Sequence, residues 1–240
     1  MRRPHLTLII FLLIFSIVNA QEYSFGIKGG LNFNSIGELY HIGTANGGGV
    51  GVIPFEDTYY TTDKEEGNHY GAFVMIDFGK LFIRSEVNFV SLKNRYPLSK
   101  KESYWTTKRI DIPILFGVKV FTPISIYAGP VLSSISTMEL EGVEFPVEFK
   151  KSAVNLSVGV LVDFDRFGFD VRYEHGIKTI ESQRVDIVRA TYGTNVAYLL
   201  EYYPSQIIVS LHINILKING NERRNRVKKG WRGTTRSCLY

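Results

Sequence analysis

Eight segments of this chain alternate large apolar residues with small or polar ones at every second position. In YSFGIKGGLNF, residues 23–33, aromatic and aliphatic side chains share one face, while glycine, serine, lysine and asparagine occupy the other. The same period recurs in residues 70–78, 81–89, 109–119, 124–133, 154–164, 167–174 and 207–215. Successive side chains of a β-strand point to opposite faces, so a period of two predicts strands with two different surroundings. The chain is therefore predicted to be all-β.

The connections between these segments alternate between short and long. The tight turns are predicted at residues 79–80, 121–123 and 165–166, and the long loops at 35–68, 91–107, 136–151 and 177–204. An even number of strands, with short turns at one end and long loops at the other, is typical of membrane barrels. The predicted fold is an eight-stranded, antiparallel, up-and-down transmembrane β-barrel. The alternative is a soluble, lipocalin-like barrel with its apolar face turned inward around a ligand.

The composition of the two faces favours the membrane barrel. The apolar face carries almost no charge, whereas the opposite face is rich in glycine and in charges of both signs, which suits a crowded interior. Each alternating segment covers about 9 to 11 residues, the length of a tilted membrane strand. Aromatic residues near the strand ends are predicted to form the two interfacial girdles: Tyr23, Phe33, Tyr70, Phe78, Phe89, Phe164, Phe167 and Tyr173.

The two ends of the chain differ from its body. Residues 1–20 combine Arg2 and Arg3 with a short apolar run and small residues before Gln21, which predicts a cleaved secretory signal and export to the outer membrane. Residues 21–216 are predicted to form the barrel, and residues 217–240 a basic, disordered periplasmic tail. Of the formal net charge of +5, the signal carries +2 and the tail +7, so the body is −4. This argues against a nucleic-acid partner for the body.

Cys238 is the single cysteine of the chain. One cysteine excludes an internal disulfide and a cysteine-based zinc cluster. No cofactor and no metal site are predicted, and the roles of Cys238 and of the tail stay open.

The charged residues of the polar face are predicted to form one network inside the barrel. Its members are Lys28, Asp77, Arg84, Glu86, Arg109, Asp111, Lys119, Asp163, Asp170, Arg172 and Glu174. An eight-stranded barrel is just wide enough for its side chains to fill it, and opposite charges there would pair. A plugged lumen is therefore the main prediction, and a narrow channel for small solutes is the alternative.

Three histidines are weaker candidates for an active site at the outer rim: His41, His69 and His175. Glu174 and His175 are adjacent in one strand, so their side chains point to opposite faces, and no third catalytic residue is fixed. His212, on the polar face, is predicted to be a hydrogen-bonded lumen residue. No catalytic residue is assigned, and the protein is not expected to be an enzyme.

Two loop features are also considered. GTANGGGVG, residues 43–51, lacks the lysine and the strand-to-helix context of a phosphate-binding loop. Tyr59 and Tyr60 lie in a long loop, where they would be available to an extracellular partner; a solvated loop without a partner is the equal alternative.

The chain is similar to the small outer-membrane β-barrels described as porin-like or PorT-like. The similarity lies in FGIKGGLNF, RIDIPILFGVKV and IYAGPVLS, taken in this order, and covers residues 21–216. It implies the Gram-negative outer membrane and no established activity, so a structural or interaction role is expected: envelope integrity, adhesion, or an accessory part of a secretion or uptake assembly. Expected partners are outer-membrane lipid and an extracellular or periplasmic protein. Unlike typical outer-membrane chains, this one continues past its last strand.

Overall fold

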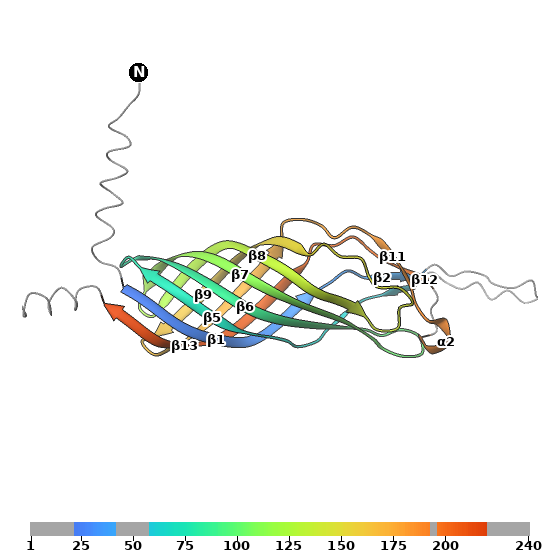
Figure 1. Ribbon diagram of the computed structural model, residues 1–240, viewed down its shortest axis with the longest axis horizontal. Helices are drawn as coiled ribbons and strands as arrows, with labels where there is room; N and C mark the ends of the chain where they lie inside the picture. Colours follow the sequence, from blue (N-terminus) through green and yellow to red (C-terminus); the bar gives the residue numbers. More distant parts are fainter. Residues whose placement is uncertain (1–21, 42–57, 193–195, 220–240) are drawn as a thin grey trace, which may run out of the picture.

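Eight long antiparallel strands close into a ring in the computed structural model, which describes residues 22–41, 58–192 and 196–219. They are β1 (Glu22–Ser35), β5 (Gly67–Asp77), β6 (Leu81–Tyr96), β7 (Ser103–Phe121), β8 (Ile124–Leu140), β9 (Ser152–Phe164), β10 (Phe167–Gly176) and β13 (Ser205–Asn219). Each pairs with its neighbour in chain order, and β13 pairs with β1 to close the ring. Figure 1 shows the tilted strands around a common axis. The eight predicted strands and the barrel are confirmed.

The tight turns all lie at one end of the barrel, which we call the turn end. They join β5 to β6, β7 to β8 and β9 to β10, as predicted, and the start of β1 and the end of β13 lie at the same end (Figure 1). Gly79 in the first turn has a φ of 91°, a left-handed conformation that glycine adopts without steric cost. β13 runs on to Asn219, so the predicted barrel limit at residue 216 falls three residues short.

At the opposite end, which we call the loop end, two of the predicted loops are largely strand. β6 and β7 continue as a long hairpin that leaves only residues 97–102 outside the strands, and β8 continues to Leu140. The predicted loop at 91–107 is therefore wrong over most of its length, which belongs to β6 and β7. The predicted loop at 136–151 is wrong up to Leu140, where β8 ends. Beyond residue 90 the outer face of the hairpin is polar, while its inner face mixes polar residues such as Asn94 with large apolar ones. Tyr96 and Trp105 on this inner face pack against a second sheet.

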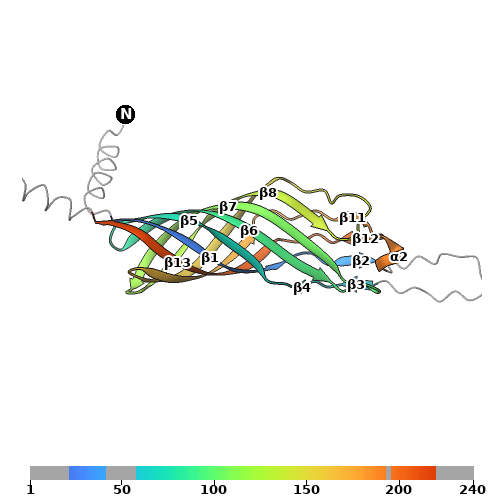
Figure 2. The same ribbon diagram turned by 60° about the horizontal axis from the view of Figure 1, so that its bottom comes forward.

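That second sheet has four short strands, β2 (Leu39–His41), β3 (Thr58–Tyr60), β11 (Gln183–Asp186) and β12 (Val196–Leu199), in the order β11-β12-β2-β3. The second sheet and the one-turn helix α2 (Arg189–Tyr192) lie at the loop end, as Figures 1 and 2 show. The short strand β4 (Asp63–Lys64) does not belong to this sheet and pairs with β6. A buried apolar core holds the sheet on the long hairpin. Its members include Leu39, Tyr96, Trp105, Ile187, Tyr192 and Leu199, all at most 4% exposed.

The outer surface of the barrel is apolar. From Tyr23 to Phe33, and over the matching lengths of the other seven strands, the outward residues are aliphatic, aromatic, glycine, alanine, serine or proline, except for Asn68 opposite Leu31. Many are large and well exposed, including Ile27, Tyr70, Val158, Phe167 and Leu211. The inward residues of the same strands include the buried charges. The lipocalin-like alternative, with its apolar face turned inward, is therefore wrong on the direction of that face, which lies outside the ring.

Glycines on the inner face of β1 allow the closest strand approaches. A Cβ at Gly26 would collide with the backbone oxygen of Ile213 and the ring of Phe73, and one at Gly30 with the backbone of Val209. Gly29, which faces outward, would place its Cβ at an ordinary 3.4 Å from the backbone oxygen of His69. The inward glycines are therefore required by packing, whereas Gly29 is not.

Several predictions concern segments outside the described residues. These are the signal, the GTANGGGVG loop, and the tail beyond residue 219 with Cys238. Within the described residues, no helix is long and apolar enough to cross a membrane.

Candidate functional site

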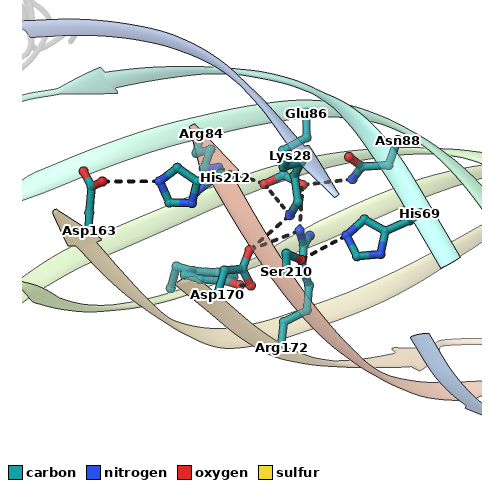
Figure 3. Close-up of polar contacts among 11 residues, drawn as sticks. Lys28, His69, Arg84, Glu86, Asn88, Asp163, Asp170, Arg172, Ser210 and His212 are labelled. Carbon is teal, nitrogen blue, oxygen red and sulfur yellow. Dashed lines mark hydrogen bonds and ion pairs between the residues drawn. The ribbon is translucent and has the colours of Figure 1, made fainter. Parts of the chain in front are cut away.

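Five buried charges meet halfway along the barrel and form what we call the central cluster: Lys28, Arg84, Glu86, Asp170 and Arg172. They come from β1, β6 and β10, where they occupy inward positions of the alternating pattern. Figure 3 shows their side chains converging on one another across the lumen. All five are at most 5% exposed.

Glu86 holds most of the cluster together. Its carboxylate lies 3.1 Å from Lys28 Nζ, 2.8 Å from Arg84 Nε and 2.7 Å from Arg172 Nη2. The amide of Asn88 donates to the same carboxylate at 2.9 Å. Because four groups share one anion, Glu86 is the member whose loss would leave the most charge unpaired.

Asp170 is the second anion of the cluster. It lies 3.1 Å from Lys28 Nζ and 3.3 Å from Arg172 Nη2, and it accepts a 2.6 Å hydrogen bond from the hydroxyl of Tyr127. The guanidinium of Arg84 lies over the ring of Phe73, 4.1 Å from its centroid. With three cations and two carboxylates, the central cluster has a net charge of +1.

A second group lies nearer the loop end. Arg109 Nη2 is 3.0 Å from both Asp111 and Glu174, and Asn155 donates to Glu174 at 2.7 Å. This upper group carries a net charge of −1, which balances the central cluster. The side chains of Arg109, Asp111 and Glu174 are at most 9% exposed. Buried charges thus compensate one another between neighbouring layers.

The remaining predicted members do not join either group. Asp77 pairs with Lys119, and Asp163 lies 3.3 Å from the buried Nε2 of His212, both near the turn end. The prediction of one continuous network is therefore wrong. The lumen role predicted for His212 is confirmed.

An apolar layer separates these turn-end pairs from the central cluster. It consists of Phe73, Met75, Phe82, Leu115, Tyr127 and Leu161. Their side chains occupy inward positions of the alternating pattern, and each is at most 4% exposed. The lumen is therefore filled by two kinds of layer, ionic in the middle and apolar toward the turn end. The alternation alone showed where these side chains point, but not that they touch.

The three candidate histidines are not brought into one site. His41 lies in β2 and bonds through Nδ1 to the backbone oxygen of Val196 at 2.7 Å. His175 lies on the outer face, 5.4 Å from the ring of Tyr203, while Glu174 points inward as predicted.

His69 is wrongly predicted at the rim, because it lies inside the barrel and is only 4% exposed. Its Nδ1 donates to Asn32 at 2.5 Å. Ser210 donates to its Nε2 at 3.0 Å, as Figure 3 shows. Within the described residues, no group of His, Cys, Asp or Glu has the arrangement needed for a metal ion. The buried amides of Asn88 and Asn155 donate hydrogen bonds to Glu86 and Glu174. In the sequence, nothing beyond their inward position pointed to this role.

Comparisons with known proteins add little to this picture. No protein-family model matches the chain, and no curated protein matches it. Among solved structures the chain is similar to the crystal structure of Neisserial surface protein A, with 11% identity and a TM-score of 0.39; the match covers 80% of this chain and 99% of that one. At these values the likeness carries no argument, so the barrel rests on the strand pairings described above.

Proposed function

We propose that the protein is an outer-membrane β-barrel with a closed lumen and a structural or interaction role in the cell envelope, acting without a cofactor and without catalysis. The observation that carries the proposal is that the barrel has apolar side chains on its outside and charged side chains on its inside, the opposite of a water-soluble protein. The ring has no free edge, its outer face is apolar along all eight strands, and its charges are buried inside. Such a surface suits hydrocarbon and not water.

The aromatic residues support a membrane position. Tyr70 and Phe89 stack at 5.4 Å toward the loop end, and Phe164 and Phe167 lie 5.3 Å apart at the turn end. From Tyr23 to Phe33, β1 advances ten residues, or about 33 Å at about 3.3 Å per residue. A tilt of about 40° reduces this to about 25 Å, which matches the apolar band of outer-membrane barrels.

The two filled layers support a plug over a channel. A solute would have to pass the central cluster, where five charges bind one another, and then the apolar layer, whose mainly hydrocarbon side chains would not replace its water. Opening either layer would strand buried charges or apolar side chains. The narrow channel is therefore the weaker proposal.

A planar-bilayer experiment tests the closed lumen. The protein refolded in detergent should insert and give no defined unit conductance, whereas an open porin in the same bilayer should conduct. A reproducible unit conductance would refute the plug. Failure to associate with phospholipid vesicles, with a monomeric state in detergent-free buffer, would refute the membrane proposal itself.

The finer assignments are also proposals. The similarity to PorT-like barrels, supported by the three sequence stretches, assigns the protein to the Gram-negative outer membrane with the second sheet facing outward. Tyr59, which is 60% exposed and 4.8 Å from the ring of Tyr40, would then face an extracellular partner. Tyr60, in contrast, is buried and bonds to Ser99 at 2.7 Å, so it has a packing role.

A further inference from the structure

A cavity of about 880 Å³, which we call the rim cavity, lies between the barrel and the second sheet. It exists because the strands are unequal. The ladder between β8 and β9 ends at Ser134 and Ser152, while β8 continues to Leu140. The segments 148–153 and 177–183 lie around the space left beside the unpaired end of β8. Its volume is in the range of about 300 to 1,000 Å³ typical of small-molecule sites.

The walls of the rim cavity are mostly apolar. The main contributors are Leu92, Trp105, Ile135, Met138, Phe149 and Ile180. Its mouth includes Val154, Ile177 and Tyr203, which are 47%, 58% and 53% exposed. Val154 belongs to the apolar outer face of β9, so the cavity wall continues into the surface that we assign to lipid. Lys178, Thr179 and Glu181 also line the cavity, so a hydrocarbon chain would enter along the side of Val154.

The floor of the cavity is polar and includes two unused hydrogen-bonding atoms. Asn34 and Gln206 are directly opposite in the β1–β13 ladder and are only 5% and 4% exposed. Asn34 donates to Asn94 at 2.6 Å, but its Oδ1 has no partner. Gln206 accepts from Asn32 at 3.1 Å, but its Nε2 has no partner. Both atoms have almost no exposed surface, so a ligand reaches them when the two side chains turn toward the cavity. An unsatisfied buried amide group is costly, so a ligand that then supplies both a donor and an acceptor would be stabilised here.

The charges of the floor select against an ionic head group. Arg109 already pairs with Asp111 and Glu174, and this upper group has a net charge of −1. Glu148, Glu181, Lys150 and Lys178 also line the cavity, and with Arg109 and Glu174 they make three charges of each sign. A carboxylate or phosphate beside Glu174 would therefore meet no excess of positive charge. A quaternary ammonium group would have no hydrogen to donate to Asn34 Oδ1. A neutral head with a carbonyl and a hydroxyl or amide N–H fits both unused atoms.

We propose that the rim cavity binds an uncharged, single-chain amphiphile, with its polar head on Asn34 and Gln206 and its hydrocarbon chain along the apolar wall to the mouth. This binding site goes beyond the structural role proposed above and does not depend on whether the lumen conducts.

Trp105 provides a specific test, because it lines the cavity and is only 1% exposed. The chain has two tryptophans, so a W231F variant leaves Trp105 as the single emitter. The variant is placed in phospholipid nanodiscs, and a monoacylglycerol with a 9,10-dibrominated C18 chain is added. Bromine quenches on contact, so probe dissolved in the bilayer cannot reach a buried ring. We expect saturable quenching that 1-monododecanoylglycerol reverses by competition.

Variants then locate the two parts of the ligand. Q206L or N34L should weaken apparent binding about threefold to tenfold, the range expected for one neutral hydrogen bond. N68L, a polar-to-apolar change on the exposed side of β5, is the matched control and should leave binding unchanged. A153F places a large side chain in the cavity and should abolish quenching. This test does not depend on whether Q206L or N34L folds.

Three results would overturn the proposal. Absence of quenching in the folded W231F protein would show that no chain enters the cavity. Equal or tighter binding of dibromostearate at pH 9 would contradict the neutral head. Quenching that persists in folded A153F would mean that the probe reaches Trp105 by another path.

Discussion

Replacement of Glu86 by glutamine should destabilise the barrel more than any other single charge neutralisation in the lumen. In the central cluster, Asp170 still lies 3.1 Å from Lys28 and 3.3 Å from Arg172, so these two cations keep a carboxylate. Arg84 does not, because Glu86 is the carboxylate with which it pairs in the described part of the chain. E86Q would therefore raise the net charge of the cluster from +1 to +2 and leave one buried guanidinium without an anion.

Removal of one partner from a buried ion pair typically costs ~3–5 kcal/mol. Arg84 keeps its contact with the Phe73 ring at 4.1 Å, which offsets part of the loss. We therefore expect the free energy of unfolding to fall by about 3 kcal/mol for E86Q. The assay is urea unfolding of protein refolded in phospholipid vesicles, followed by the electrophoretic mobility of the folded form, with linear extrapolation to water.

A second substitution shows whether the effect arises from charge. R84M removes the stranded cation, so R84M/E86Q should recover most of the stability, and the double-mutant cycle should give a coupling of about 2 kcal/mol. D63N, in the exposed pair with Arg95, is the matched control and should leave the urea midpoint unchanged. A wild-type midpoint for E86Q, or simple additivity of the two substitutions, would show that the cluster does not act as argued.

Three further predictions concern other parts of the molecule. G26A should lower the free energy of unfolding by about 1–3 kcal/mol, because its Cβ would meet the backbone of the adjacent strand. G29A should leave it unchanged in the same urea assay. Equal effects would contradict the assignment of Gly26 to the inner face and Gly29 to the outer face. V160R, on the outer face, should cost about 2–4 kcal/mol in vesicles relative to V160L, and no cost would argue against lipid contact. At the loop end, the hydrogen bond from Lys101 holds the pKa of Glu141 below its ordinary value of 4.5, so this pair stabilises the fold at neutral pH and loses its effect as the pH falls through the lowered pKa. K101M should raise the Glu141 pKa in a carboxyl NMR titration, and an unchanged value would exclude Lys101 as the cause.

The alternating pattern was sufficient to predict the barrel because it reflects a purely local rule. A strand between two different surroundings must change residue type at every position, whatever its partners are. Residues 23–33 illustrate this, since the inward Lys28 and the outward Ile27 are where the period places them. The tight turns followed from the same pattern, because they are simply the short gaps between strands.

Contacts between strands were beyond the reach of the sequence. The period places Asp163 and Asp170 on the same inner face, but only the register shows that the first lies near the turns with His212 and the second in the central cluster. His69 appeared to be a rim residue because the strand β5 begins earlier than its apolar pattern does.

The second sheet and the rim cavity depend entirely on tertiary structure. Strands of three or four residues are too short to show a period, and β2 and β12 pair although about 155 residues separate them along the chain. The cavity results from unequal strand lengths in the closed ring. The sequence thus determined which side of each strand faces which surroundings, because that depends on neighbours along the chain. Which side chains meet in the lumen was decided by the register and closure of the ring, which bring distant strands together.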